Sequence, residues 1–214
     1  MMVFSRTRFY PIVRDLHLYF GLLISPFVLV FAFSVFFLVH AWLPRATGGS
    51  VSARHTATGL RLPLNLDKLE IRQRVEALRP ILDQLGVAGE IYSIRHVPRE
   101  HRLVITVSVP GRETAIDLDY EQNIAAVAAR ETGLAGALVY LHKSPGPHLA
   151  AIRGNWAMTQ IWRFLADASA YVVLFLSISG IYLWTVLRAE RTVGLVLMVL
   201  GAASFFGMVY ALAR

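Results

Sequence analysis

The sequence predicts a membrane protein with three transmembrane α-helices and a small α+β domain outside the cytoplasm, placed between helices 1 and 2. Hydrophobic residues make up 56% of the chain and charged residues only 16%, with a mean hydropathy of +0.53. This composition is unlike that of ordinary soluble domains. The apolar residues gather in three windows that lack Asp, Glu, Lys, Arg and His, at residues 18–39, 168–187 and 192–213.

Each window is long enough to cross about 30 Å of hydrocarbon as a helix. We therefore expect transmembrane helices at residues 17–43, 158–187 and 192–213. The first could instead be a cleaved signal peptide, because basic residues precede it. Its apolar run exceeds the roughly 7 to 15 residues of a signal peptide, however, and no small-residue cleavage site follows, so an uncleaved anchor is expected. Three spans are too few for a repeat-built transporter or a multi-helix channel.

The positive charge of the chain is explained by the membrane rather than by nucleic acid. The net charge is +7, but residues 44–160 contain 14 Lys and Arg against 11 Asp and Glu, mixed in sign. The other basic residues mostly flank the spans, at Arg6, Arg8, Arg14, Arg188 and Arg191. Basic flanks favour the cytoplasm. Residues 1–16 and the turn at residues 188–191 are therefore predicted to be cytoplasmic, with the main domain and the C-terminus in the periplasm of a bacterium.

The central segment divides into a linker at residues 44–59, a domain at residues 60–130, and a helix and loop at residues 131–157. Apolar residues at helical spacing predict a helix over Leu66–Leu85, with Asn65 as its N-cap, Gly86 at its end and a kink or break at Pro80. Alternating apolar residues predict a strand at Leu103–Val109, and a second strand, Thr114–Tyr120, follows the turn at Pro110-Gly111. Glu90–His96 is a candidate third strand.

Two further features are expected near the second span. Glu131–Lys143 is apolar at helical spacing and is predicted to be a helix. Arg163 and Asp167 lie one turn apart, which favours an interfacial ion pair; the alternative is that Arg163 contacts a propionate or a substrate.

The chain has no cysteine, which excludes disulfides, thiolate metal sites, iron–sulfur clusters and cysteine catalysis. It also lacks a nucleophile elbow, a zinc-protease motif and a phosphate-binding loop. A bound metal would therefore need His, Met or carboxylate ligands. Seven histidines are available.

Two histidines bracket the first span. His17 and His40 are 23 residues apart, which is roughly 34 Å along a helix, so they cannot bind one metal but could each bind one. Haem b fits these constraints, because it takes imidazole ligands and an apolar pocket without cysteine. The first span is unusually aromatic, with phenylalanines at positions 20, 27, 31, 33, 36 and 37. The alternative interpretation is that these residues only pack at the membrane.

His142 lies shortly before the second span, where it could face His40 across one haem as a bis-imidazole pair. His148 is the substitute if the loop disfavours His142. His17 has no histidine partner in the later spans, so a second haem would need a single ligand or a second His17 from a homodimer. The remaining histidines, His55, His96 and His101, are predicted to be surface or turn residues.

Several segments resemble the PepSY-associated transmembrane proteins. The matching segments are Leu16-His17 with Gly21, Asp117-Leu118-Asp119-Tyr120, Leu141-His142, and Ser179-Gly180-Ile181-Tyr182-Leu183-Trp184. The last resembles the closing pattern of that family. The resemblance implies a PepSY-like outer domain and a haem b reductase of the inner membrane that acts on ferric siderophores in iron uptake, with His17 and His142 as haem ligands. Larger members of the family have four spans. Because this chain has three, the presence of an inner haem is left open.

Two functions of different classes follow. The first is a membrane haem b protein that passes electrons to an outer-face acceptor, with a ferric chelate as a candidate. The second is a cofactor-free, membrane-anchored PepSY module that binds or regulates a periplasmic partner such as a peptidase. The expected surroundings are membrane lipid and a homodimer or larger membrane complex. The sequence identifies neither the electron donor nor the acceptor.

Overall fold

The structure is a computed structural model, and it describes residues 6–40, 51–63, 65–66, 68–144, 146, 151–187 and 191–213. The chain divides into two compact units. One comprises residues 1–26 and 168–214, and the other comprises residues 27–167. Two long helices, α1 (Arg6–Val39) and α4 (Ala157–Leu187), each contribute one part to each unit.

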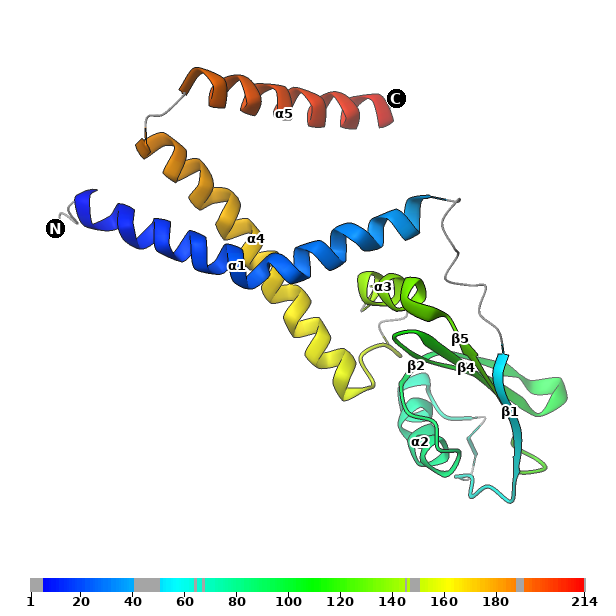
Figure 1. Cartoon of the computed structure of the whole chain (residues 1–214). Helices are drawn as coiled ribbons and strands as arrows, with labels where there is room; N and C mark the ends of the chain where they lie inside the picture. The colour runs from blue at the N-terminus through cyan, green and yellow to red at the C-terminus, as the bar shows by residue number, and fades with distance from the viewer. Residues whose placement is uncertain are drawn as a thin grey trace. The chain divides into compact units, whose positions relative to one another are not determined.

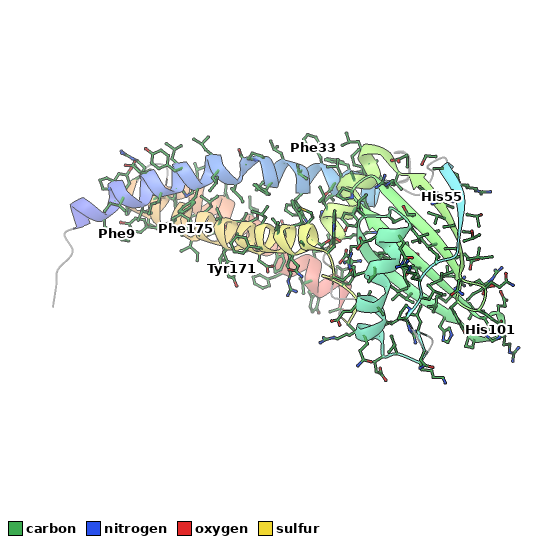
Figure 2. All side chains as sticks on the ribbon, turned by 90° about the horizontal axis from the view of Figure 1, so that it is seen from below. Phe9, Phe33, His55, His101, Tyr171 and Phe175 are labelled. Carbon is green, nitrogen blue, oxygen red and sulfur yellow. The ribbon has the colours of Figure 1, made fainter. Side chains whose placement is uncertain are left out.

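Three helices in the described part of the chain are long and apolar enough to cross a membrane (Figure 1): α1, from Phe9 to Val39, α4, and α5 (Arg191–Leu212). They agree with the predicted spans in number and order. Large apolar side chains on these helices project outward, as for Phe9, Phe33 and Tyr171 in Figure 2, which are 48%, 58% and 74% exposed. Such surfaces are suited to lipid rather than to water.

In the first unit, α1 and α4 pack antiparallel through aromatic contacts. Phe9 meets Tyr182, and Phe20 meets Phe175, each edge to face with ring centroids 5.5 Å apart. The start of α5 approaches α4 so closely that a Cβ on Gly194 would overlap the Trp184 ring. Small residues commonly permit such close approach between membrane helices.

The second unit contains the predicted α+β domain, built on an antiparallel sheet of five strands in the order β1-β5-β4-β3-β2. The strands are β1 (Val51–Thr58), β2 (Glu90–Val97), β3 (Arg102–Val109), β4 (Arg112–Asp119) and β5 (Ile124–Glu131). Helix α2 (Ile71–Gln84) packs on one sheet face through Val75, Leu78, Ile81 and Leu82. Alternate strand residues form the other half of this core, including Leu103, Ile105, Ile116 and Leu118.

Helix α2 is shorter than predicted. It begins after Glu70, which makes no side-chain capping bond, while Asn65 lies in an earlier turn with φ of 58°. The predicted cap at Asn65 was therefore wrong. The C-terminus is as expected: Gly86 adopts φ of 66°, and the amides of Gly86 and Val87 bond to the carbonyls of Asp83 and Leu82. This is the Schellman arrangement, which favours glycine.

Pro80 lies inside α2 and does not split it, contrary to one expectation from the sequence. The buried residues before and after the proline, Leu78 and Leu82, both pack into the core. Packing of this apolar side offsets the hydrogen bond that the proline removes.

The linker predicted at residues 44–59 is corrected by the structure, because residues 51–58 form strand β1. This edge strand is exposed along almost its whole length, so its sequence carries no alternation of apolar and polar residues. Residues 44–50 lie outside the described part of the chain. Strand β5 also went unpredicted, because its alanines have low strand propensity. Residues 124–131 form a strand because they pair with β4 on one side and β1 on the other.

Helix α3 (Gly133–Lys143) follows β5 and confirms the helix expected over Glu131–Lys143. Its amide at Gly136 bonds to the Thr132 carbonyl, and its last turn carries His142 and Lys143. The same unit thus contains the sheet, α3, the end of α1 and the beginning of α4.

We predict that Gly89→Ala destabilises the sheet domain by about 3 kcal/mol. Gly89 has φ of +148°, and an added Cβ would lie 2.8 Å from Val107 Cγ1 and 2.9 Å from Val109 Cγ1, so overpacking adds to backbone strain. Gly59→Ala is the control, since Gly59 also has positive φ but no atom within 4 Å of its added Cβ. It should cost about 1 kcal/mol. Thermal unfolding of the full chain in detergent measures both, and equal losses would contradict this packing.

Candidate functional site

The side chain of His142 reaches from α3 to α1. Its Nδ1 lies 2.7 Å from the hydroxyl of Ser34. Its ring also meets the ring of Phe31 edge to face, with centroids 5.7 Å apart. Ser34 is fully buried, so this hydroxyl has no access to water.

The direction of this bond depends on where the Ser34 hydroxyl sends its one proton. The hydroxyl also lies 2.6 Å from the Phe31 carbonyl, to which helical serines commonly donate. With the proton directed at that carbonyl, the oxygen accepts from Nδ1 of His142; with the proton turned towards Nδ1, His142 is the acceptor. The first arrangement leaves a neutral His142 with a free lone pair on Nε2, which can act as a metal ligand or as a base.

His17 has the same arrangement in the other unit. Its Nδ1 lies 2.7 Å from the hydroxyl of Ser179, which also lies 3.2 Å from the Leu176 carbonyl. Ser179 is 4% exposed. Here the histidine belongs to α1 and the serine to α4, whereas His142 meets a serine of α1. If Ser179 donates to the Leu176 carbonyl, Nε2 of His17 is again the ring nitrogen with the free lone pair.

The segment Ser179 to Trp184 therefore has a structural explanation. Ser179 bonds to His17, and a Cβ on Gly180 would lie 3.5 Å from Cε1 of His17, so this glycine lies against the imidazole. Trp184 covers Gly194 at the start of α5. One short segment thus orients an imidazole and holds two helices together.

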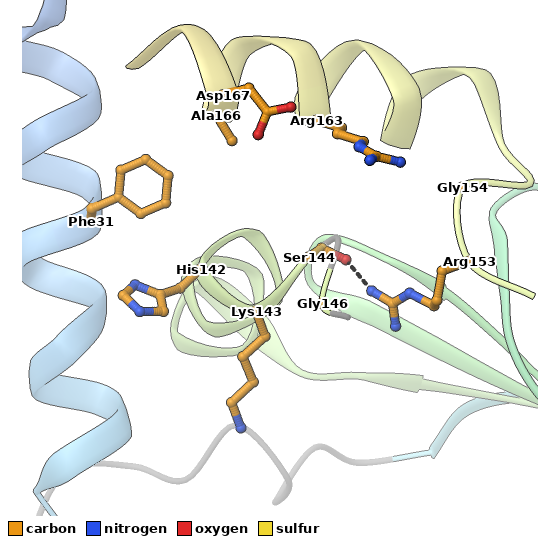
Figure 3. Close-up of a pocket in the computed structure, with 10 residues that line it drawn as sticks. All are labelled: Phe31, His142, Lys143, Ser144, Gly146, Arg153, Gly154, Arg163, Ala166 and Asp167. Carbon is orange, nitrogen blue, oxygen red and sulfur yellow. Dashed lines mark hydrogen bonds between the residues drawn. The ribbon is translucent and has the colours of Figure 1, made fainter. Parts of the chain in front are cut away.

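A cavity of about 580 Å³ adjoins His142 (Figure 3). It lies within the second unit and is lined by residues of α1, α3, α4 and the segment before α4. Its lining residues are Phe31, His142, Lys143, Ser144, Gly146, Arg153, Gly154, Arg163, Ala166 and Asp167. This volume is in the range of cofactor and small-molecule sites.

Trp162 of α4 holds the end of α3 beside this cavity. Its Nε1 donates to the carbonyls of Leu141 and Ser144, each at 3.0 Å. Its ring lies against Phe27 and Phe31 of α1, with centroids 6.4 Å and 6.0 Å away. One indole therefore joins three helices around His142.

A buried ion pair ties the cavity wall to the sheet. Glu90 at the start of β2 is fully buried, and its Oε1 lies 3.4 Å from Nε of Arg153, which is 8% exposed. Glu90 also accepts bonds from the Gly154 amide at 2.8 Å and the Tyr140 hydroxyl at 3.1 Å. Arg153 donates to the Ser144 hydroxyl at 2.6 Å. The sheet is thereby connected to the last turn of α3.

Two neighbours complete this network. The guanidinium of Arg153 lies over the Tyr92 ring, 4.5 Å from its centroid. Burial raises the pKa of Tyr140, which keeps its hydroxyl neutral and able to donate to Glu90. The charge of Glu90 is therefore compensated from several directions, as a buried carboxylate requires.

The other predicted site residues are placed as follows. His40 follows the end of α1 and stacks on Phe36, with centroids 5.6 Å apart. It comes six residues after Ser34, which is about 9 Å further along a helix and roughly 120° around it. Its pairing with His142 stays a prediction. His148 lies outside the described residues.

Two histidines of the sheet domain, His55 and His101, are exposed, as expected (Figure 2). His96 differs from the prediction: it lies in strand β2, is half-buried, and contacts the Tyr120 hydroxyl at 3.2 Å. The described residues contain no group of three or more His, Cys, Asp or Glu that could hold a metal ion. A metal bound in this part of the chain would thus rely on few protein ligands.

The expected ion pair between Arg163 and Asp167 is not formed. Across the described ranges, Arg163 makes neither an ion pair nor a hydrogen bond, although both residues line the cavity. One helical turn permits such a pair but does not require it, since exposed pairs gain little free energy.

The two serines were not recognised from sequence as site residues. Ser179 belongs to a segment that matches the family pattern but has no role assigned from sequence, and Ser34 lies in no matching segment. The available signal was a hydroxyl residue inside an apolar span, where it needs a hydrogen-bond partner.

Comparison with known proteins identifies one relation. The family model for PepSY_TM-like proteins matches residues 12–212, almost the whole chain. Neither a curated protein nor a solved structure is significantly similar to it.

We predict that Glu90→Gln lowers the free energy of unfolding by about 3 kcal/mol, because it leaves the buried Arg153 without its counter-charge. Glu113→Gln, on the exposed part of β4, is the matched control and should change it by less than about 0.5 kcal/mol. Thermal unfolding of the full chain and its sensitivity to protease are the measurements. A Glu90→Gln protein as stable as the control would show that this ion pair does not hold the sheet to α3.

Proposed function

Because the chain belongs to the PepSY_TM-like family, we propose that it is a haem b electron-transfer protein of the bacterial inner membrane. It passes electrons to an acceptor at the outer face, and a ferric siderophore is the candidate acceptor. The observation that carries this proposal is the hydrogen bond between Nδ1 of His142 and the hydroxyl of Ser34, with its counterpart at His17 and Ser179.

The residues at His142 fit haem b. Histidine ligands of metals almost always donate their other ring N–H to a fixed acceptor, which sets the tautomer and the ring orientation. Ser34 is such an acceptor. The adjoining cavity offers Phe31 as an apolar wall and cationic side chains elsewhere. Haem bound there would supply one-electron chemistry, while His142 would hold it and Trp162 would hold α3 in place.

His17 would hold a second haem in the same manner. Its further ligand would come from a second chain in a homodimer, or the haem would have a single histidine. At the outer site, His40 is the proposed partner of His142, and His148 is the substitute.

The proposed orientation places the sheet domain and the C-terminus in the periplasm, and the N-terminus and the turn at residues 188–191 in the cytoplasm. The basic flanks of the apolar helices support it. In this orientation His142 serves the outer face and His17 the cytoplasmic face.

The alternative function, a cofactor-free module that binds or regulates a periplasmic partner, is favoured by one observation. The sheet face opposite α2 carries a hollow lined by residues such as Arg95, Val104 and Asp117. Neither the hydrogen-bonded histidines nor the cavity beside His142 has a role in this alternative.

The visible spectrum of the purified chain from haem-replete cells distinguishes the two functions. Haem b function predicts a Soret band with α and β bands that sharpen on reduction. A colourless preparation with a folded sheet domain would contradict it and support the partner-binding module.

Replacing a histidine ligand should remove its haem, whereas replacing the serine that bonds to that histidine should only weaken haem binding. His142→Ala should abolish the outer haem, and His17→Ala should affect only a second one. Ser34→Ala and Ser179→Ala keep the ligand but lose its support, so haem affinity should fall about 10- to 100-fold. Ser177→Ala is the control, because its exposed hydroxyl bonds only to the Val173 carbonyl. Haem titration of each full-length variant measures this, and serine variants that bind like wild type would contradict the supporting role.

The partner of His142 is tested separately. His40→Ala should convert the outer haem from low-spin to high-spin if His40 is the second ligand. An unchanged spectrum would remove His40 from the site. If the His142→Ala protein keeps a low-spin haem that is lost when His148 is also replaced, His148 rather than His142 is the ligand.

The proposed orientation has its own test. A periplasm-specific reporter fused within the loop at residues 121–123 should be active, and one placed at the N-terminus should be inactive. The opposite result would reverse the assignment of both histidines to their membrane faces.

A further inference from the structure

The cavity beside His142 has two chemically different ends. At one end Phe31 and His142 supply aromatic and imidazole surfaces from α1 and α3. Towards the other end lie the guanidinium groups of Arg153 and Arg163 (Figure 3). Lys143 and the carboxylate of Asp167 also line the cavity. Such a cavity suits a ligand with an apolar body and an anionic group.

The three cations differ in whether they are available to a ligand. Arg153 is already engaged by Glu90, the Ser144 hydroxyl and the Tyr92 ring. Lys143 leaves α3 pointing away from the cavity in Figure 3. Arg163 projects from α4 towards the cavity, and it has no ion pair or hydrogen bond with any residue in the described ranges.

We propose that Arg163 binds a carboxylate of the ligand whose other end lies at His142. A guanidinium presents a planar fork of donors that matches a carboxylate with two parallel hydrogen bonds. Under the proposed function, on which this inference rests, the carboxylate is a haem propionate. A small free carboxylate would offer the same chemistry, and the experiment separates the two sources.

Asp167 limits the strength of this site but does not remove it. It lies one turn after Arg163 and lines the same cavity, yet no ion pair joins the two within the described part of α4. The charge of Arg163 therefore remains available, and Asp167 would favour a ligand with one or two carboxylates over a more highly charged anion.

The test compares haem with haem dimethyl ester, whose propionates carry no charge, in titrations of the haem-free full chain in detergent. Wild type should bind haem about tenfold more tightly than the ester, because one charge-assisted contact is lost. Arg163→Gln should bind both equally and keep the histidine-dependent spectrum. Arg72→Gln, which makes the same charge change on the exposed side of α2, should retain the preference.

The outcomes distinguish the two proposals. Equal binding of haem and ester by wild type, with a spectrum that depends on His142, would overturn the propionate contact and leave haem function standing. If the chain binds neither form, haem function fails, and calorimetric titration with succinate then tests Arg163 alone. Succinate binding that Arg163→Gln abolishes would support a free carboxylate as the ligand, and its absence would overturn the site.

Discussion

The arrangement of the two histidines depends on how two serine hydroxyls, buried among apolar residues, make their hydrogen bonds. A serine on a helix has one proton to donate, and both Ser34 and Ser179 lie within hydrogen-bond distance of a carbonyl of their own helix and of an imidazole on another helix. If each serine donates to its own helix, it accepts from the imidazole, and the other ring nitrogen is left with a free lone pair.

Other contacts hold in place the helices that carry the two histidines. In the unit that contains the sheet, the last turn of α3 is held in place by Trp162 and by Arg153, which Glu90 neutralises. The sheet therefore does more than cover a core: it anchors the segment that ends at the cavity. In the other unit, aromatic contacts between α1 and α4 and the close approach of α5 at Gly194 serve the same purpose for His17.

The sequence predicts those parts of this molecule whose signals are local. Apolar runs identified α1, α4 and α5. Alternation identified β3, the turn after it indicated β4, β2 was the candidate third strand, and Gly86 correctly ended α2. Strands β1 and β5 were missed because an exposed edge and an alanine-rich strand are determined by their neighbours rather than by pattern. Histidines at membrane ends were visible, but Ser34 was not, since a partner 108 residues away leaves no local trace.

The tautomer of the two imidazoles is the central claim, and it can be measured before any cofactor is bound. The measurement is ¹⁵N NMR of histidine ring nitrogens in the haem-free full chain, in detergent above pH 7.5 or so, where unperturbed histidines are neutral. We expect His17 and His142 to carry their proton on Nδ1, and Ser179→Ala and Ser34→Ala to remove those two signals one at a time. Protons on Nε2 at both residues, unaffected by either substitution, would contradict the account.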